Sequence, residues 1–306
     1  MSRIWKLTLI VVLLITVIVW LLPFSTTDNL KVITCDVGQG DASLIVYKST
    51  EILIDGGPDN SVLECLSKHL PFWDRTIEVV VLTHPQSDHY TGLIGVFSHY
   101  RVEKILANSL EVSNQQNGLL KNQVLGQGSE WVRPVSGMVV RSRTIQLDIL
   151  YPSEEIFTRN FTPSDSDSSQ NANFAEVLEA ESTKVDPNDI SVVSLVTFGS
   201  FKFLFTGDAG SNILDSLASS NVLISKKPIN YIKVSHHGSK SALSEKLYAL
   251  TDLGIAVISV GENSYGHPHQ EVSNALSRFG LKVYRTDRVG DIVVETDGKK
   301  IWVVKQ

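Results

Sequence analysis

Three apolar segments of the chain each end in histidine or aspartate, and this feature limits the possible folds and chemistries more than any other. The segments lie at 79–82, 203–205 and 231–234, and the residues that follow them are His84, Asp88 and His89, then Asp208, then His236 and His237. Strand carboxyl ends in an α/β sheet form the edge at which ligands bind. Imidazole and carboxylate groups are ligands for Zn²⁺ and Mn²⁺. A satisfied core residue would explain one cluster, but three clusters together predict a shared metal site.

The chain after residue 28 alternates between short β-branched runs and helical patterns, which is typical of an α/β sandwich. Hydrophobic residues make up 42% and charged residues 20%, the balance of a globular domain. We therefore expect one domain over residues 29–306. We expect strands at 30–37, 43–47, 51–54, 77–83, 145–150, 191–198, 202–205, 231–234, 256–260, 282–284, 291–295 and 301–304. We expect helices at 60–70, 211–218, 243–250 and 270–279.

The N-terminal segment differs from the rest of the chain. Arg3 and Lys6 precede residues 7–24, a run without any charged residue. About 18 apolar residues can just cross a bilayer. Residues 1–28 are therefore predicted to form a membrane anchor and a spacer, with the catalytic domain on the extracytoplasmic side because positive charge precedes the span. The alternative is a cleaved signal that leaves the domain secreted, although the segment lacks a small-residue cleavage site.

A polar segment at 162–188 interrupts the alternating pattern. It is rich in serine, aspartate and asparagine and then becomes acidic. Such a composition does not bury enough apolar surface to form a core. We therefore predict a surface loop inserted into the domain and assign no chemistry to it.

Two cysteines, Cys35 and Cys65, are too few for a disulfide framework and lack the spacing of a metal knuckle. Free cysteine is among the most buried residue types. We therefore expect two buried thiols. A single bridge between them is the alternative if the domain is exported.

Further motifs accompany the three clusters. They are DVGQGDA at 36–42, IDGG at 54–57, NDISVV at 188–193, NSYGHP at 263–268, and YRTD at 284–287 followed by GDI at 290–292. In this order the chain resembles the metallo-β-lactamase fold superfamily, and more narrowly its competence-protein (ComEC-like) branch, from about residue 30 to 300. The resemblance implies a four-layer αβ/βα sandwich and a metal-dependent hydrolase. It does not extend to the branch's channel, because one N-terminal span is not a multi-span transporter.

The resemblance also implies which residues hold metal. The implied ligands are His84, Asp88, His89, Asp208, and His236 or His237. His84 would belong to a first metal site and Asp88 to a second, with Asp208 bridging both. Asp55 would orient the ligands from behind. Gln86 stands where the superfamily has histidine, and a neutral amide is a poor ligand, so we expect one well-held Zn²⁺ or Mn²⁺ and a second that is weak or absent.

The resemblance places further residues next to the substrate. Asp88, Asp208 and His267 would be catalytic, with His267 as a general acid or a phosphate donor. The implied substrate-binding residues are Asp41, Ser239, Lys240 and His267. Lysines and arginines near the clusters, Lys233, Lys240, Arg285 and Arg288, would contact phosphates.

These roles predict hydrolysis of phosphodiester bonds, with DNA as the substrate and a metal-activated water as the nucleophile. The net charge of −6 gives no overall attraction to a polyanion, so any such groove must be local. Two alternatives stay open. One is another hydrolase on the same fold, acting on a lactam, lactone or thioester. The other is a non-catalytic, membrane-tethered domain that binds DNA or a partner.

Overall fold

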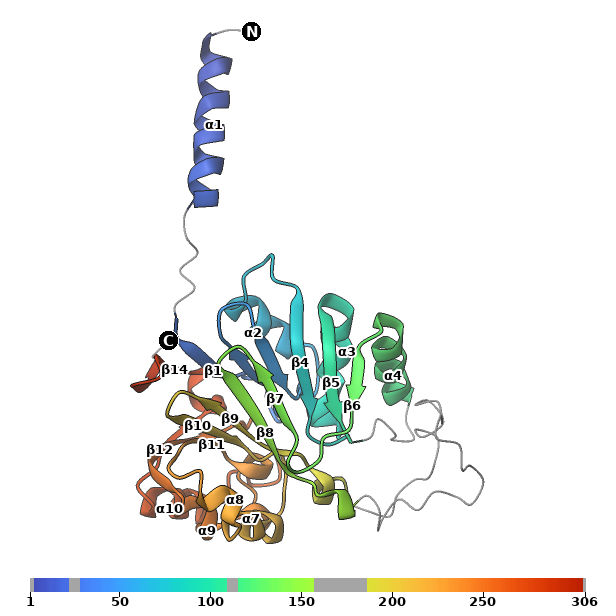
Figure 1. Cartoon of the computed structure of the whole chain (residues 1–306), viewed down its shortest axis with the longest axis vertical. Coiled ribbons are helices and arrows are strands. Elements are labelled where there is room, and N and C mark those ends of the chain that lie inside the picture. The colour runs from blue at the N-terminus through green and yellow to red at the C-terminus, as the bar shows by residue number, and fades with distance from the viewer. Residues whose placement is uncertain (1–2, 22–27, 109–114, 157–185, 305–306) are drawn as a thin grey trace.

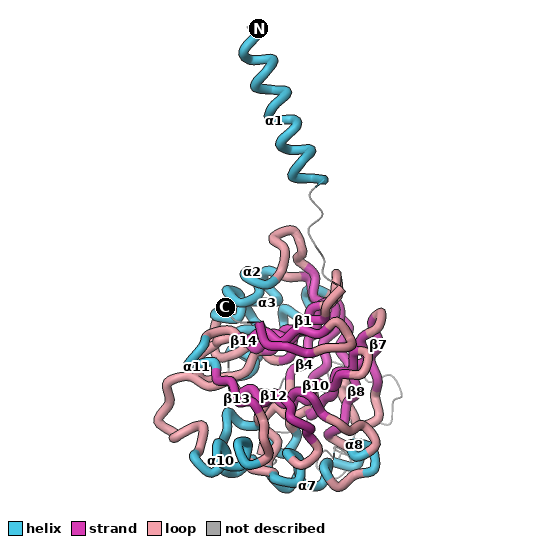
Figure 2. Tube along the Cα trace, turned by 90° about the vertical axis from the view of Figure 1, so that its left-hand side faces the viewer, coloured by secondary structure: helices cyan, strands magenta, loops and turns pink. Residues whose placement is uncertain are grey.

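Two β-sheets pack face to face at the centre of the protein, and helices cover their outer faces (Figures 1 and 2). The computed structural model describes residues 3–21, 28–108, 115–156 and 186–304. The first half of the chain builds most of one sheet, and the second half builds most of the other. The last two strands return to the first sheet, so both halves contribute to it.

The first sheet has eight strands in the order β15-β14-β1-β2-β3-β4-β5-β6. Its strands, in chain order, are β1 (Leu30–Thr34), β2 (Ser43–Val46), β3 (Glu51–Ile54), β4 (Thr76–Leu82), β5 (Arg101–Ala107), β6 (Glu130–Val132), β14 (Ile292–Thr296) and β15 (Ile301–Val304). Strands β3 to β6 run parallel to one another.

The second sheet has seven strands in the order β13-β12-β11-β10-β9-β8-β7. Its strands are β7 (Val139–Ser142), β8 (Ile145–Tyr151), β9 (Val193–Phe198), β10 (Phe201–Phe205), β11 (Ile229–Lys233), β12 (Thr251–Ile258) and β13 (Lys282–Arg285). Strands β10 to β13 run parallel. Each sheet therefore has a parallel half, and the strand ends of one parallel half can lie next to those of the other.

The helices form two outer layers. Those beside the first sheet are α2 (Ser61–His69), α3 (Ser87–His99) and α4 (Gln115–Gln127). Those beside the second sheet are α7 (Ser211–Ala218), α8 (Asn221–Ile224), α9 (Glu245–Tyr248) and α10 (Gln270–Arg278), and α11 (Thr286–Val289) leads from β13 towards β14. The predicted four-layer sandwich is confirmed.

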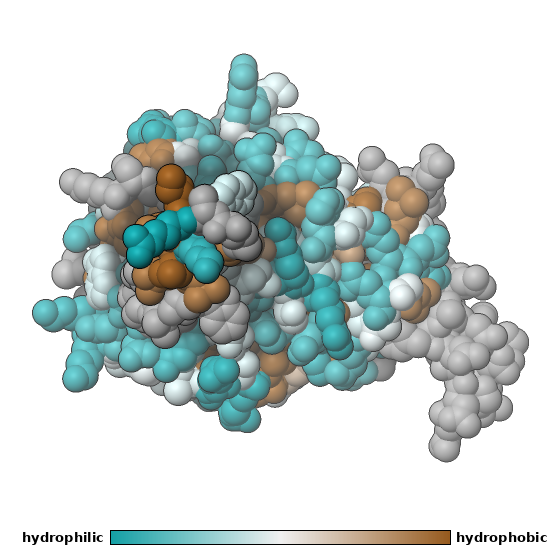
Figure 3. Space-filling view, turned by 90° about the horizontal axis from the view of Figure 1, so that it is seen from above, coloured by the Kyte–Doolittle hydropathy of each residue, from teal (hydrophilic) through white to brown (hydrophobic). Residues whose placement is uncertain are grey.

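Helix α1 (Arg3–Leu21) stands apart from the two sheets (Figure 1). Within the part of the chain that the structure describes, no helix has the length and apolar character needed to cross a membrane. The membrane anchor therefore stays a prediction. Seen from the α1 side, the coloured surface of the domain is mainly hydrophilic (Figure 3).

Strand β4 shows why the sequence forms layers. Val80 and Leu82 belong to the apolar cluster beneath α2 and α3, whereas Val79 and Val81 belong to the cluster between the sheets. Successive side chains of a strand point to opposite faces. Both faces of β4 are buried, which explains its continuous apolar run.

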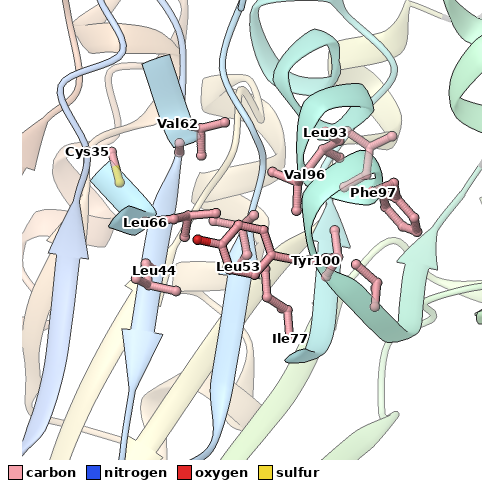
Figure 4. Packing of buried hydrophobic residues seen from close by; sticks show 14 of the residues in the cluster. Cys35, Leu44, Leu53, Val62, Leu66, Ile77, Leu93, Val96, Phe97 and Tyr100 are labelled. Carbon is pink, nitrogen blue, oxygen red and sulfur yellow. The ribbon is translucent and has the colours of Figure 1, made fainter. Parts of the chain in front are cut away.

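Three apolar clusters fill the spaces between the four layers. The cluster beneath α2, α3 and α4 includes Leu53, Leu66 and Tyr100 (Figure 4). A second lies between the sheets, and a third lies beneath α7 to α10. With three separate interfaces to fill, the fold needs a large share of apolar residues.

The sequence missed several elements. Strands β5, β6 and β7 and helices α3, α4, α8 and α11 were not among the expected elements. The predicted polar insertion at 162–188 lies almost entirely outside the described residues.

The prediction of two free thiols was wrong. Cys35 and Cys65 form a disulfide, with their Cα atoms 5.8 Å apart. Cys35 follows β1 and Cys65 lies on α2, and both are buried in the cluster shown in Figure 4. We predicted free thiols because free cysteine is usually buried. Both cysteines are indeed buried, but in the same place, where they form a disulfide.

Gly92 on α3 is a test of the close packing between α3 and the segment after β3. A Cβ at Gly92 would lie 2.0 Å from the carbonyl oxygen of Gly56 and 2.3 Å from that of Asp59. We expect Gly92→Ala to lower the free energy of unfolding by about 3 kcal/mol or more, since backbone atoms must move. Urea denaturation measures this loss.

Gly118 on α4 is the matched control, because no atom of the described residues, apart from the backbone of α4 itself, lies within 4 Å of an added Cβ there. Gly118→Ala should stabilise the helix by roughly 0.5–1 kcal/mol. Equal effects of the two substitutions would contradict the close approach of α3.

Candidate metal centre

Four side chains from three sequence clusters converge where the parallel strands of both sheets end. They are Asp88, His89, Asp208 and His237, and one ligand atom of each lies within 4.8 Å of those of the others. Asp88 and His89 lie in the first turn of α3, Asp208 follows β10, and His237 follows β11. The backbone N–H of Val192 donates to Thr83 O at 2.9 Å, which joins the two sheets at this edge.

Asp55 holds this arrangement from behind. Its carboxylate accepts the backbone N–H and the hydroxyl of Thr83, each at 2.8 Å. The same carboxylate lies 2.8 Å from Nδ1 of His89. Nδ1 therefore carries a proton as the donor, and Nε2 of His89 is directed towards Asp208 at 3.4 Å. A carboxylate behind a histidine ligand fixes the ring and its tautomer.

His237 is fixed by a second set of contacts. Its Nδ1 lies 3.0 Å from the carbonyl oxygen of Ser259 and 3.2 Å from Asp41 Oδ1. Asp41 is in turn hydrogen-bonded to the ammonium of Lys233, and both side chains are buried. Nε2 of His237 then faces the carboxylates of Asp88 at 3.3 Å and Asp208 at 3.7 Å.

The structure separates the roles of the two adjacent histidines, which the sequence left open. His237 is buried and joins the four-residue cluster, whereas Nε2 of His236 lies 3.8 Å from Asp208 and its ring faces His267 at 5.7 Å. Both residues adopt a positive φ, 50° and 51°. This turn of the backbone buries the side chain of His237 and leaves that of His236 27% exposed.

The buried charges shift the pKa values of the cluster. Burial alone would lower the pKa of His237, but the carboxylates of Asp208 and Asp41 raise it to about 9. Burial also opposes protonation of His89, yet Asp208 and Asp55 raise its pKa well above the usual value. Burial would raise the pKa of Asp208, but His89 and His237 hold it well below its usual range. Without a metal, protons on the histidines balance the carboxylates.

His84 lies beside the cluster but is not part of it. Its ring centroid is 4.1 Å from that of His89, and its Nδ1 lies 3.1 Å from the hydroxyl of Thr83. Burial and the neighbouring His89 lower the pKa of His84 to about 4, so it is neutral at physiological pH. Neutral imidazole is the metal-binding form, but Gln86, whose backbone N–H donates to the carbonyl oxygen of His84 at 3.0 Å, offers only an amide side chain.

The cluster fits a divalent metal ion. Several buried atoms of the cluster and of the adjacent His84 have no hydrogen-bond partner among the described residues, namely Nε2 of His84, His89 and His237 and both carboxylate oxygens of Asp208. Buried polar atoms are normally paired, and unpaired ones indicate a missing ion or water. Imidazole nitrogens and carboxylate oxygens match Zn²⁺ or Mn²⁺. The structure therefore supports one ion held by Asp88, His89, Asp208 and His237.

Other predicted residues lie elsewhere. Asp41 is buried, so the structure does not support its predicted contact with substrate and places it behind His237 instead. Lys233 is buried with it and does not face solvent. Lys240 pairs with Glu271 at 2.6 Å, on the outer helix α10.

Three further predicted residues, His267, Ser239 and Arg285, lie outside the four-residue cluster. His267 is partly exposed and its ring lies close to His236. The hydroxyl of Ser239 is bonded to that of Ser241 at 2.9 Å. Arg285 pairs with Asp287 at 2.6 Å.

Sequence reasoning missed the supporting contacts of the ligands. Thr83 was predicted only as the last residue of the strand at 77–83. The role of Ser259 has no sequence signal, because every residue has a backbone carbonyl group. Lys233 did have a signal: it is a charged residue inside the apolar run of β11, where only a paired cation is tolerated.

The fold and the cluster together define a metallo-β-lactamase type of protein. The family model described as "Metallo-beta-lactamase superfamily" matches residues 35–262, so the chain belongs to this superfamily. Its fold is that of metal-dependent hydrolases.

Two relatives indicate which branch of the superfamily the chain resembles. The chain is 24% identical over 276 residues to ComE operon protein 3 of Bacillus subtilis (strain 168), covering 84% of this chain and 32% of that protein. It is 27% identical over 271 residues to Recombination protein 2 of Haemophilus influenzae, covering 86% of this chain and 28% of that protein. The chain thus spans about a third of the length of these relatives. The resemblance to the competence-protein branch is confirmed.

Solved structures share the fold at low identity. The metallo-beta-lactamase fold protein YhfI from Bacillus subtilis superposes with a TM-score of 0.53 and 12% identity, covering 88% of this chain and all (100%) of that one. CmlA, a diiron β-hydroxylase from Streptomyces venezuelae, superposes with a TM-score of 0.51 and 12% identity over 91% of this chain and 55% of that one. These matches show the architecture only.

The raised pKa values of His89 and His237 predict that metal binding releases protons. Both histidines bind protons in the metal-free chain at neutral pH and must lose them to become ligands, so affinity must fall as pH falls. We expect the affinity for Zn²⁺ to rise roughly tenfold per pH unit for each proton released between about pH 6 and pH 8. Competition with a chromophoric chelator measures it, and a pH-independent affinity would contradict the prediction.

The buried pair of Asp41 and Lys233 predicts a coupled effect on stability. Lys233→Met leaves the Asp41 carboxylate buried without its cation, and we expect a loss of about 3–5 kcal/mol in the free energy of unfolding. Adding Asp41→Asn should recover part of the loss, because it removes the uncompensated charge.

Lys240→Met is the matched control, because Lys240 forms an exposed ion pair with Glu271. Urea denaturation should show a change within about 1 kcal/mol. Strictly additive effects of Lys233→Met and Asp41→Asn would refute the coupling.

Proposed function

We propose that this protein is a metal-dependent phosphodiesterase that cleaves DNA. The buried cluster of Asp88, His89, Asp208 and His237, with its unpaired ligand atoms, carries the hydrolytic part of the proposal. The names of the relatives, ComE operon protein 3 and Recombination protein 2, support DNA as the substrate class. We propose Zn²⁺ or Mn²⁺ as the ion, well held at one position, with any second ion near His84 weak or absent.

The cluster opens to solvent on the side of Asp88. The side chain of Asp88 is 30% exposed, whereas those of Asp208 and His89 are 1% and 0% exposed. The substrate must therefore approach over Asp88. A divalent ion held there supplies a water of lowered pKa and neutralises charge on a phosphoryl oxygen. Asp88 can accept a proton from a water on the open side, and Asp208 stays ionised because its pKa is held low.

His267 stands on the same open side. Its ring lies beside that of His236, and its Nδ1 is buried without a partner. Burial and the neighbouring imidazoles lower the pKa of His267, so it is a neutral hydrogen-bond donor in the free protein. An anionic phosphodiester would raise that pKa and favour proton transfer to the leaving oxygen.

The location of the domain is also a proposal. The disulfide between Cys35 and Cys65 supports an oxidising compartment, because such bonds persist mainly outside the cytosol. We infer that residues 7–24 anchor the chain in the membrane with the domain on the extracytoplasmic side, or that their cleavage leaves it secreted.

Asp88→Asn tests the proposed activity. We expect cleavage of single- or double-stranded DNA with added Mn²⁺ or Zn²⁺ to fall by at least about 100-fold, because the residue acts on the reacting atoms. Metal bound per chain is measured by mass spectrometry on the same samples.

Asp59→Asn is the matched control, since Asp59 is an exposed carboxylate outside the cluster. It should leave cleavage unchanged. Metal binding without cleavage of any DNA would favour a lactam, lactone or thioester as substrate. Neither metal nor cleavage would leave a non-catalytic binding domain.

His267→Ala tests the proton donor separately. We expect kcat on DNA to fall by roughly 10²–10⁴-fold while bound metal is unchanged. A phosphodiester with a nitrophenolate leaving group needs no proton donor, so its cleavage should fall much less. Equal losses on both substrates would show that His267 does not protonate the leaving group.

A further inference from the structure

A second group of metal-ligating side chains lies apart from the candidate metal centre. Ligand atoms of Cys65, His69 and Asp291 lie within 4.8 Å of one another, and Cys35 is bonded to Cys65. Both cysteines belong to the apolar cluster beneath α2 and α3, on the outer side of the first sheet. None of the four residues belongs to the cluster that the proposed hydrolysis uses.

The fold brings these residues together from three segments. Cys65 and His69 are four residues apart on α2, so they share one face of the helix. Strands β1 and β14 are antiparallel neighbours whose last pair joins Thr34 to Ile292. Cys35 and Asp291 adjoin this pair, each directly beyond it, so the two lie side by side at the same strand ends.

The contacts of Asp291 direct one oxygen towards the histidine. Asp36 N–H donates to its Oδ1 at 2.8 Å, and its Oδ2 lies 3.2 Å from Nε2 of His69. Its side chain is 3% exposed and that of His69 is 14% exposed. Lys68 approaches the same oxygen at 3.5 Å, but its side chain is 61% exposed and can move into solvent.

The oxidation state of the cysteines decides what this group can bind. In the disulfide the two sulfur atoms are bonded to each other and are not thiolate ligands. A dithiol reductant transfers two electrons and two protons to the bond and leaves as its own cyclic disulfide. The products are two thiols beside an imidazole and a carboxylate, and the thiols lose their protons when they bind a metal ion.

We propose that Cys35, Cys65, His69 and Asp291 form a zinc site when the disulfide is reduced. Two cysteines, a histidine and an aspartate supply the four ligands of a closed tetrahedral site. Cys65 already lies with His69 and Asp291, and the Cα atom of Cys35 is 5.8 Å from that of Cys65, so Cys35 is the neighbouring side chain that completes the set. The ion takes over the link between β1, α2 and β14 that the disulfide makes in the oxidised chain.

The link supports the segment that carries Asp41. Cys35 directly precedes the segment 36–42, and Asp41 within that segment contacts His237 and Lys233. The inference does not rest on the proposed activity, since it concerns binding at different residues.

Cobalt binding to the full chain tests the site. Cysteine thiolates bound to Co²⁺ give a near-ultraviolet charge-transfer band, and the candidate metal centre contains no cysteine. We expect no such band in the oxidised chain. After reduction by a dithiol and its anaerobic removal, we expect the band and one more ion per chain, and zinc should displace the cobalt.

Substitutions of three proposed ligands, with His99→Ala as the control, test which side chains bind the ion. Cys65→Ser should abolish the band, and His69→Ala should weaken cobalt binding at least tenfold, roughly the loss expected when a ligand shell is incomplete. His99→Ala, an exposed histidine at the end of α3, should change nothing. A reduced, folded chain without the band would overturn the proposal, and so would a band that His69→Ala and Asp291→Asn leave unchanged. If reduction unfolds the chain, zinc must restore its near-ultraviolet circular dichroism, and failure to do so also refutes the site.

Discussion

The carboxylate of Asp55 is the interaction on which the rest of the site depends. It binds the backbone and hydroxyl of Thr83 at the end of β4 and faces His89 at the start of α3. One buried group thereby fixes where a strand ends, where a helix begins and which nitrogen of a histidine is free. Burial raises the pKa of Asp55, and the contacts with His89 and Thr83 oppose this shift because they favour the ionised carboxylate.

Charge balance in the interior is the second organising constraint. Burying Asp208 and Asp41 would be unfavourable if each stood alone, since an unpaired buried charge is strongly destabilising. In the metal-free chain, protonated His89 and His237 compensate Asp208, and Lys233 compensates Asp41. Metal ion and protons therefore compete for the same negative charge, so the centre couples metal binding to pH.

Much of the fold was predictable because both sheets contain strands buried on two faces, and such strands leave long apolar runs. Strand β5 was missed because three of its first four residues, Arg101, Glu103 and Lys104, are charged, and β6 has only three residues. The cluster was predictable because its ligands follow those runs directly. The choice between His236 and His237 was not, since it depends on a turn of the backbone. The roles of Asp41 and Ser259 depend on contacts between residues more than 190 and about 20 positions apart, respectively.

The left-handed backbone of His236 and His237 has a consequence for how such a chain evolves. For a residue with a side chain, this conformation costs roughly 1 kcal/mol or more in folding free energy, whereas glycine adopts it without that cost. Two residues with side chains in this conformation lower the folding stability of the turn, and in return two imidazoles stand next to Asp208. Replacing these histidines would therefore remove the imidazoles from the site. Substitutions that raise the thermal stability of the protein and keep the site intact must lie elsewhere in the sandwich.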